Sequence, residues 1–299
     1  VSVAATHRRR GIARALLEGE LRAAHAAGLP MAMLTVSEAT IYGRWGFGPA
    51  TYRADYRIDT RGLRLTAPLP EGRVHRVTAS ALRPLAAGIS ARARTAGEVP
   101  VFELYWDRLF GLSSRTASRA AQLRAARYDD AAGEPQGFVV YSVKENPADF
   151  ADHTVRVEYL CAASDDAAVA LWHYLLGLDL VTTVVAALRP VDEPLMWMVS
   201  NPRAVQTTAR SEHLWLRVLD VPTALSARRY AGADSVTLRV TDPLGFADGT
   251  WMLTTDADGR ATVTDDEPST GTAVIELDVE ARSAVMLGGT PVEAMRIAG

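Results

Sequence analysis

Residues 1–36 limit the fold more than any later stretch, because strand-like and helical patterns alternate there around one glycine. The apolar start at Val1 to Val3 is typical of the end of a buried strand. A basic turn follows, and a helix is expected to begin at about Gly11 and to run to Ala27. After a Gly-Leu-Pro stop, the apolar run 31–36 predicts a second buried strand. This succession predicts an α/β fold.

The turn before the first predicted helix carries the pattern Arg8-x-x-Gly11-x-Ala13. Backbone N–H groups in the first turn of a helix have no partner within the helix, and the helix dipole adds partial positive charge there. Gly11 lets a ligand approach the backbone closely, because it has no Cβ. The pattern therefore predicts an anion site, and the alternative is a solvated basic turn. The residues of the predicted site are Arg8, Arg9, Arg10, Gly11, Ile12, Ala13 and Arg14.

A second motif follows the predicted strand 31–36. A short helix is expected to carry Tyr42, and a Gly-x-Gly-Pro turn then feeds the next predicted strand, Thr51 to Ile58. A phenol has a pKa near ~10, so Tyr42 is protonated at neutral pH and can donate a proton to a leaving group. The alternative is a packed aromatic side chain on a short helix.

The chain divides into three predicted domains and a linker. Residues 1–60 form the first α/β part, and residues 61–72, which hold two prolines and two glycines, form the linker. Residues 73–210 repeat the α/β pattern without a glycine-rich phosphate loop, and residues 211–299 predict a sheet flanked by helices. The strands expected beyond residue 60 are 74–77, 123–128, 137–143, 155–161, 181–188, 214–219, 236–240, 250–255, 261–264 and 273–277, and the helices are 81–95, 102–110, one capped by Ser164, 222–228 capped by Asp220, and 280–286.

Composition argues against several classes of function. The 32 basic and 35 acidic residues leave a net charge of −3, and no basic tract interleaves with aromatics, so no nucleic-acid partner is expected. The longest apolar runs have the length of strands, so neither a membrane span nor a signal peptide is expected. The six histidines never fall at metal-ligand spacing, so no metal is expected.

Other features have plain structural interpretations. The lone cysteine, Cys161, precludes an intramolecular disulfide, fits a reducing cytoplasm and lies in a strand-like run, which favours burial over a nucleophilic role. Asp258-Gly259 predicts a hairpin turn rather than a calcium loop. The acidic run 265–267 predicts a solvated loop. Glu103 and Asp107 share one helix face, which is either solvated or available to ammonium groups.

The stretch THRRRGIAR, followed by SEATIYGRWGFGPAT and a long extension, resembles the Eis (enhanced intracellular survival) family of GNAT-type N-acetyltransferases. The resemblance covers essentially the whole chain. It implies an acetyl-CoA-binding GNAT domain, a second GNAT-like domain without the cofactor motif, and a C-terminal domain similar to sterol carrier proteins. It also implies a homo-oligomer, either a hexamer or a trimer, and the acetylation of amines, notably several amines of one aminoglycoside antibiotic.

The resemblance also implies roles for particular residues. Val1, Ser2 and Val3 would bind the pantetheine arm of acetyl-CoA by strand-like hydrogen bonds, and the motif Arg8 to Arg14 would hold the pyrophosphate. Ser37 and Glu38 would border the cofactor. Tyr42 would act as the general acid that protonates the departing thiolate.

The two ends of the sequence differ from the family pattern. Family members use the α-carboxylate of their last residue as the general base, on an aromatic-rich tail that residues 295–299 do not resemble. The chain also begins midway through a GNAT domain, so we expect a fragment trimmed at both ends. Two alternatives to a polyamine acetyltransferase stay open: a lysine acetyltransferase that acts on proteins or peptides, and a non-catalytic scaffold whose C-terminal domain carries an apolar ligand.

Overall fold

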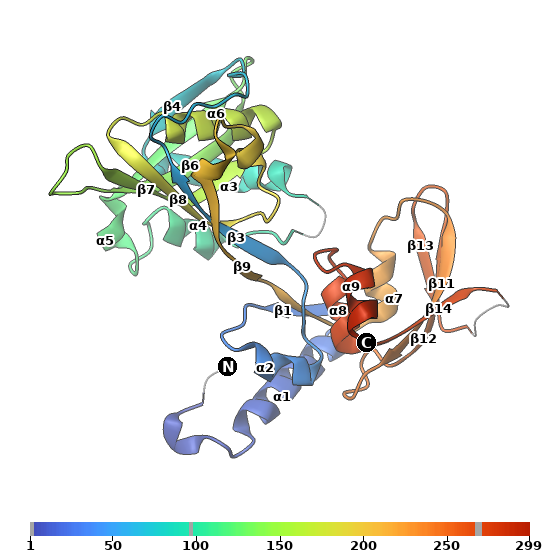
Figure 1. Cartoon of the computed structure of the whole chain (residues 1–299). Coiled ribbons are helices and arrows are strands. Elements are labelled where there is room, and N and C mark those ends of the chain that lie inside the picture. The colour runs from blue at the N-terminus through green and yellow to red at the C-terminus, as the bar shows by residue number, and fades with distance from the viewer. Residues whose placement is uncertain (1–2, 96–97, 267–270) are drawn as a thin grey trace. The chain divides into compact units, whose positions relative to one another are not determined.

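The computed structural model describes residues 3–95, 98–266 and 271–299 of the chain (Figure 1). Its contacts divide the chain into two compact units. The first unit is discontinuous and combines Val1–Tyr52 with Glu212–Gly299, whereas the second is the continuous stretch Arg53–Ser211. Val1 and Ser2, two of the residues predicted to bind the pantetheine arm, lie outside the described residues.

A seven-stranded sheet forms the centre of the second unit, with the strand order β4-β5-β6-β7-β8-β3-β9. Its strands are β3 (Tyr52–Asp59), β4 (Arg73–Val77), β5 (Leu123–Asp129), β6 (Pro135–Lys144), β7 (His153–Ala162), β8 (Val181–Arg189) and β9 (Val205–Glu212). Neighbours from β4 to β7 pair antiparallel, β7 and β8 pair parallel, and β8 and β3 pair antiparallel. The strand predicted at 51–58 therefore belongs to the same sheet as the later strands.

Helices cover both faces of this sheet, because alternate side chains of its strands point to opposite sides. On β6, Val139 and Tyr141 join the apolar cluster under α6 (Asp165–Leu176), while Phe138 and Val140 join the cluster under α3 (Ala79–Ala93) and α4 (Glu103–Leu109). The remaining helical segments of the unit are α5 (Ala117–Ala120), η3 (Pro194–Trp197) and η4 (Pro202–Ala204).

The predicted linker 61–72 lies against the core of the second unit. Leu63, Leu65 and Ala67 pack on the cluster that contains α6, and Leu65 forms an isolated antiparallel bridge with Val199. The stretch is therefore packed rather than a free linker, because burying its apolar side chains removes them from water.

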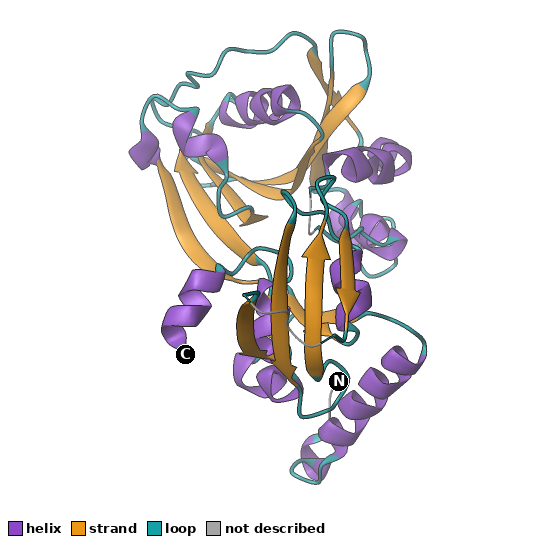
Figure 2. Cartoon of the chain, turned by 90° about the vertical axis from the view of Figure 1, so that its right-hand side faces the viewer, coloured by secondary structure: helices purple, strands orange, loops and turns teal. Residues whose placement is uncertain are grey.

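Two smaller sheets build the first unit. The three-stranded sheet has the order β1 (Met31–Leu34), β10 (Trp215–Val218), β2 (Gly48–Pro49), and both of its pairings are antiparallel. The four-stranded sheet, turned toward the viewer in Figure 2, has the order β13-β12-β11-β14, with a parallel pairing between β11 and β14. Its strands are β11 (Asp234–Thr241), β12 (Gly249–Thr255), β13 (Ala261–Thr264) and β14 (Ala273–Asp278).

The first unit contains the four helices predicted from its sequence and three further helical segments. They are η1 (Ala5–His7), α1 (Ile12–Ala26), α2 (Ala39–Tyr42), η2 (Gly43–Trp45), α7 (Val221–Ser226), α8 (Val279–Val285) and α9 (Val292–Ala298). The predicted cap at Asp220 is confirmed, since its Oδ1 accepts the N–H of Thr223 at 3.0 Å. Helix α9, with the sequence VEAMRIA, was not predicted, and none of its residues is buried.

The predicted strand end at Val1 to Val3 is wrong for its described residue. Val3 is not in a strand, and a short 3-10 helix begins at Ala5. A strand needs a partner for its backbone groups. Within the described residues, the three-stranded sheet consists of β1, β10 and β2, and none of them pairs with Val3.

We expect Ser164→Ala to lower the free energy of unfolding by about 1 kcal/mol. The Ser164 hydroxyl accepts the N–H of Ala167 at 3.2 Å and caps α6, whose buried face includes Leu171 and Trp172. Ser118→Ala, on the exposed surface of α5, is the matched control. Urea unfolding curves with the same midpoint for both variants would contradict the capping role.

Candidate functional site

The N-terminus of α1 presents free backbone donors, as the sequence predicts. The first intrahelical hydrogen bond runs from Ala15 N–H to the carbonyl of Gly11 at 2.9 Å, and no side chain caps the helix. The N–H groups of Ile12, Ala13 and Arg14 therefore have no partner within the helix. Gly11 has a φ of +75°, and no atom lies within 4 Å of the place where a Cβ would be. The helix end is thus open to an anion.

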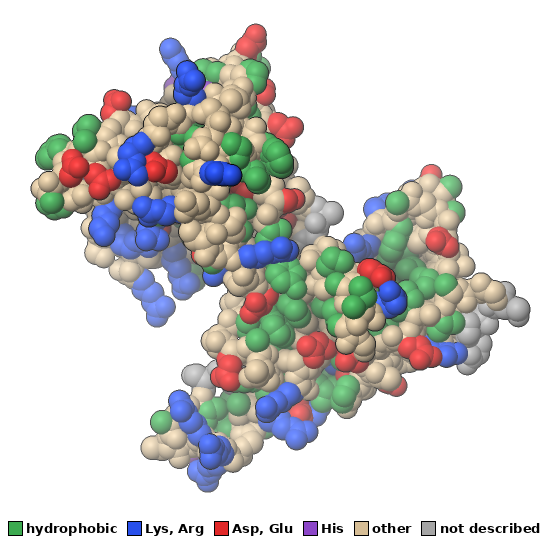
Figure 3. Space-filling model, in the orientation of Figure 1, with side chains coloured by type: hydrophobic (Ala, Val, Ile, Leu, Met, Phe, Trp, Pro, Cys, Tyr) green, Lys and Arg blue, Asp and Glu red, His purple; other side chains and the backbone are tan. Residues whose placement is uncertain are grey.

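Arginines surround this helix end (Figure 3). Arg8, Arg9 and Arg10 are exposed on the turn, and Arg9 has a left-handed φ of 59°. Arg14 is placed differently, because its Nε donates to Glu18 at 2.6 Å. The hydrogen bonds from Arg14 and Arg22 lower the pKa of the Glu18 carboxyl. The Arg14 side chain is 74% exposed and the Glu18 side chain 12%, so the arginine reaches the solvent while the carboxylate is largely covered.

Tyr42 occupies the last position of α2 and is half-buried. Its ring lies 6.2 Å from the ring of Phe47 in an edge-to-face arrangement, and 6.4 Å from that of Trp45. These three rings join one apolar cluster with Leu17 and Leu21 of α1. Helix α1 and the segment that carries Tyr42 therefore pack against each other in one cluster, and this close packing fixes their relative positions.

The other predicted cofactor residues lie between β1 and α2. Ser37 and Glu38 are both exposed, and Glu38 is the first residue before α2. The Glu38 carboxylate accepts the hydroxyl of Thr40 at 3.1 Å rather than a backbone N–H of the helix. Val3, the described member of the predicted pantetheine residues, lies just before η1.

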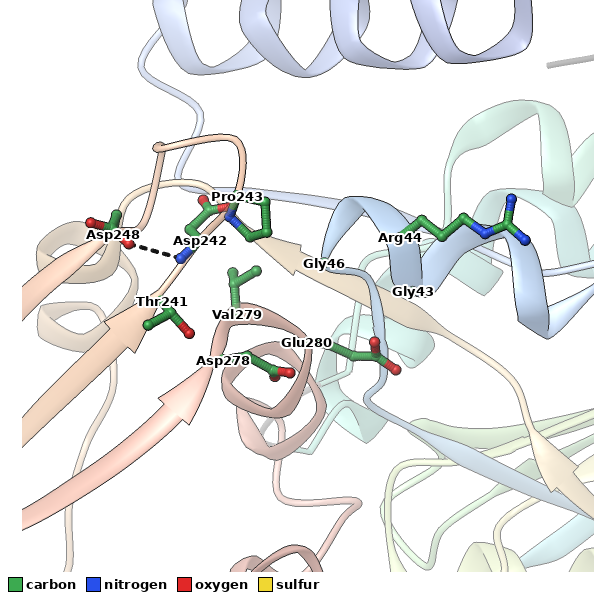
Figure 4. Close-up of a pocket in the computed structure, with 10 residues that line it drawn as sticks. All are labelled: Gly43, Arg44, Gly46, Thr241, Asp242, Pro243, Asp248, Asp278, Val279 and Glu280. Carbon is green, nitrogen blue, oxygen red and sulfur yellow. Dashed lines mark hydrogen bonds between the residues drawn. The ribbon is translucent and has the colours of Figure 1, made fainter. Parts of the chain in front are cut away.

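A cavity of about 370 Å³ adjoins the turn after Tyr42 (Figure 4). Glu280 reaches Gly43 closely enough that a Cβ on this glycine would lie 2.8 Å from a carboxylate oxygen. Burial, assisted by the neighbouring Asp278, raises the pKa of the Glu280 carboxyl. The residues around the cavity are Gly43, Arg44, Gly46, Thr241, Asp242, Pro243, Asp248, Asp278, Val279 and Glu280. The sequence analysis did not predict this cavity. Its lining residues come from two segments, 43–46 and 241–280, which lie almost 200 positions apart, and no local pattern links them.

Other features that the sequence analysis considered give less support for a functional site. Asp107 accepts a hydrogen bond from Arg83 at 2.7 Å, and Glu103 pairs with the same arginine, so a neighbouring side chain already engages both carboxylates of this helix face. The hairpin turn at Asp258-Gly259 is confirmed, because the Asp256 carboxylate accepts the N–H groups of Asp258 and Arg260. Across the described ranges, no group of His, Cys, Asp and Glu could hold a metal ion, and no helix is long and apolar enough to cross a membrane.

Comparison with known protein families divides the chain in three. Residues 1–50 match a family described as an acetyltransferase (GNAT) domain, residues 102–218 match a second family with the same description, and residues 221–299 match a sterol carrier protein domain.

Individual relatives extend this similarity along the whole chain. An uncharacterized N-acetyltransferase of Streptomyces avermitilis is 35% identical over 100% of this chain and 72% of its own length. The N-acetyltransferase Eis of Mycobacterium tuberculosis is 34% identical over 96% of this chain and 69% of its own length. The crystal structure of Eis1 from Mycobacterium abscessus superposes with a TM-score of 0.85 at 32% identity, covering 100% of this chain and 73% of that one.

Cys161 is expected to be chemically inert in the folded protein. Burial raises the pKa of its thiol to about 11, so about one molecule in 10³ carries the reactive thiolate at pH 8. A thiol reagent such as 5,5′-dithiobis(2-nitrobenzoate) should label native protein at least about 100-fold more slowly than protein in guanidinium chloride. Equal rates would show that Cys161 is accessible, and Cys161→Ser supplies the blank.

Proposed function

Because the chain belongs to the Eis family of GNAT-type N-acetyltransferases, we propose that it transfers the acetyl group of acetyl-CoA to the primary amines of polyamines such as aminoglycosides. The family implies acetyl-CoA as the co-substrate. The observation that carries the proposal is the open N-terminus of α1, which shares one apolar cluster with Tyr42. Acetyl transfer from acetyl-CoA uses a site that binds the phosphates of the cofactor and a donor that protonates the departing thiolate. These two features would supply both roles.

The α1 N-terminus would hold the pyrophosphate of acetyl-CoA. The N–H groups of Ile12, Ala13 and Arg14 point along the helix axis toward the open end, where the dipole favours negative charge. The exposed side chains of Arg8, Arg9 and Arg10 would add positive charge around the phosphates. Arg14 would join them by leaving Glu18, which keeps its ion pair with Arg22, for a phosphate oxygen.

Tyr42 would serve as the general acid. A neutral amine of the acceptor attacks the thioester carbonyl, a C–N bond forms and the C–S bond breaks. The phenolic proton of Tyr42 passes to the departing sulfur, and the surplus proton of the attacking nitrogen leaves to a base or to water. The backbone N–H near Val3 would polarise the carbonyl oxygen, and Ser37 and Glu38 would border the cofactor.

The choice of acceptor, the assembly and the domain limits complete the proposal. Polyamine acceptors and a hexameric or trimeric homo-oligomer follow from the family resemblance. The domain limits 1–60, 73–210 and 211–299, with 61–72 as the linker between the first two, follow from the sequence pattern. A lysine peptide is the competing acceptor. Assays that offer the same enzyme a polyamine antibiotic and a lysine peptide separate the two by their kcat/KM values.

We expect Tyr42→Phe to lower kcat by about 10²-fold or more, because the thiolate then leaves without a proton donor. The Kd for acetyl-CoA should stay unchanged, since the ring and its packing against Phe47 are retained. Tyr52→Phe is the control, because it removes a hydroxyl of the same unit that bonds Thr290 at 3.3 Å. Stopped-flow or steady-state thiol release measures kcat, and an unchanged value in Tyr42→Phe would refute the acid assignment.

Gly11→Asp should weaken acetyl-CoA binding at least about tenfold, a loss of about 1.4 kcal/mol, because it places negative charge and bulk at the pyrophosphate position. Gly28→Asp is a matched control at the other end of the same helix. Gly28 has a φ of +74° against +75° for Gly11, and neither has an atom within 4 Å of a Cβ position, so both variants carry the same backbone strain. Isothermal titration that finds equal acetyl-CoA affinity in both variants would contradict the pyrophosphate site.

A further inference from the structure

A buried arginine from a distant strand holds the turn that follows Tyr42. Arg217, on β10, is 0% exposed. Its Nε donates to the carbonyl oxygen of Trp45 at 2.6 Å, and its Nη2 donates to both carboxylate oxygens of Asp242 at 2.7 Å. Its Nη1 donates to the carbonyl of Val218. All three nitrogens of the guanidinium are thus committed, which fixes the side chain in one orientation.

The partner carboxylate is equally well satisfied. Asp242 accepts the N–H groups of Leu244 at 3.0 Å and of Ala247 at 2.9 Å in addition to Arg217. Burial opposes its charge, but the hydrogen bond from Arg217 and these backbone donors outweigh burial and lower the pKa of the Asp242 carboxyl. Burial lowers the pKa of Arg217, yet a guanidinium stays protonated at neutral pH. The pair is therefore ionic at neutral pH.

The backbone of the Tyr42 turn is shaped to receive this arginine. Gly46 has a left-handed φ of +75°, and a Cβ on it would lie 2.4 Å from Cγ1 of Val279 and 2.9 Å from Nε of Arg217. The turn is continuous from Tyr42, because Gly46 N–H bonds the carbonyl of Gly43 at 2.8 Å and Phe47 N–H bonds that of Tyr42. Figure 4 shows Gly46, Val279 and Asp242 around the same cavity.

The contact at Trp45 leads directly to the tyrosine. Trp45 lies three positions after Tyr42, and their rings pack 6.4 Å apart. Movement of the Trp45 carbonyl would move its ring and change the packing of the Tyr42 ring. A shift of about 1 Å in a group that must meet a reacting atom can cost up to about 10²-fold in rate.

We propose that Arg217, anchored by Asp242, is a positioning residue that sets the orientation of Tyr42 through the Trp45 carbonyl. The proposal rests on the proposed role of Tyr42 as general acid. It makes the segment after β11, which lies within the sterol-carrier-like match, a part of the apparatus for acetyl transfer rather than an independent binding module.

The test is a double-mutant cycle on kcat in the full chain. Arg217→Lys keeps a positive charge beside Asp242, but a single ammonium cannot reproduce the rigid fork that reaches Trp45 as well. We expect Arg217→Lys to lower kcat at least about tenfold and to leave the Kd for acetyl-CoA within about twofold. In the Tyr42→Phe background the same change should alter kcat by less than about twofold, because the group that it positions is gone.

The matched control is Arg239→Lys. Arg239 forms an exposed pair with Glu276 at 2.8 Å in the same unit, so its substitution should leave kcat and Kd unchanged. If Arg217→Lys does not fold, Gly46→Ala replaces it. Its Cβ would lie 2.9 Å from Nε of Arg217 and 2.4 Å from Cγ1 of Val279, so it displaces both side chains, and Gly28→Ala controls for the strain of a positive φ.

The outcomes separate the two proposals. The positioning role is supported if Arg217→Lys lowers kcat in the chain that keeps Tyr42 but not in the Tyr42→Phe variant. The same loss in both backgrounds, or no loss in either, overturns it, because a merely structural role would act independently of Tyr42. An unchanged kcat in Tyr42→Phe alone contradicts the proposed acid, and this result is read without any Arg217 variant.

Discussion

The buried ion pair between Arg217 and Asp242 is the interaction on which the first unit depends. It joins three segments that are far apart in the sequence: the Tyr42 turn, β10 and the loop after β11. Removing one partner of such a pair leaves an uncompensated buried charge, which typically costs about 3–5 kcal/mol. The hydrogen bond from Arg217 to Trp45 thus ties the two ends of the chain together, in addition to the pairing of β10 with β1 and β2, although the second unit lies between them in the sequence.

Two glycines, Gly46 and Gly48, let the backbone of the segment after Tyr42 pack closely against α8. A Cβ on Gly48 would lie 2.3 Å from the carbonyl oxygen of Glu280, and one on Gly46 would meet Val279 at a similar distance. Helix α8 therefore packs directly on the turn, where larger residues would hold it away. The turn from Tyr42 to Phe47 consequently has two physical roles in our proposal: Tyr42 would supply the proton donor, and Gly46 supplies the surface on which Arg217 and α8 dock.

Local patterns in the sequence predicted the elements that local physics determines. The helix after Gly11, the short helix at Tyr42, the caps at Ser164 and Asp220 and the turn at Asp258-Gly259 are all confirmed. Each depends on hydrogen bonds or dihedral angles within a few residues, which a single sequence reveals.

The pairing of distant segments could not be predicted in the same way. The strand at 214–219 was expected to begin the C-terminal sheet, whereas β10 lies between β1 and β2. Strand neighbours depend on tertiary packing that leaves no periodic signal in one sequence. For the same reason the sequence did not distinguish Arg217 from other arginines on strands. Its burial and its contacts with Asp242 and Trp45 depend on the tertiary structure. The roles of Arg8 to Arg14 and of Tyr42 in catalysis stay predictions, supported by the placement of their elements.

The measurement that tests the central claim most directly is the release of CoA thiol from acetyl-CoA by the full chain, with a polyamine antibiotic and a lysine peptide as acceptors. The account predicts thiol release that requires an amine, saturates in both substrates and matches the amount of N-acetylated product found by mass spectrometry. Saturable binding of acetyl-CoA without amine-dependent thiol release for any acceptor would contradict it, and would favour a scaffold that uses the same anion site for binding alone.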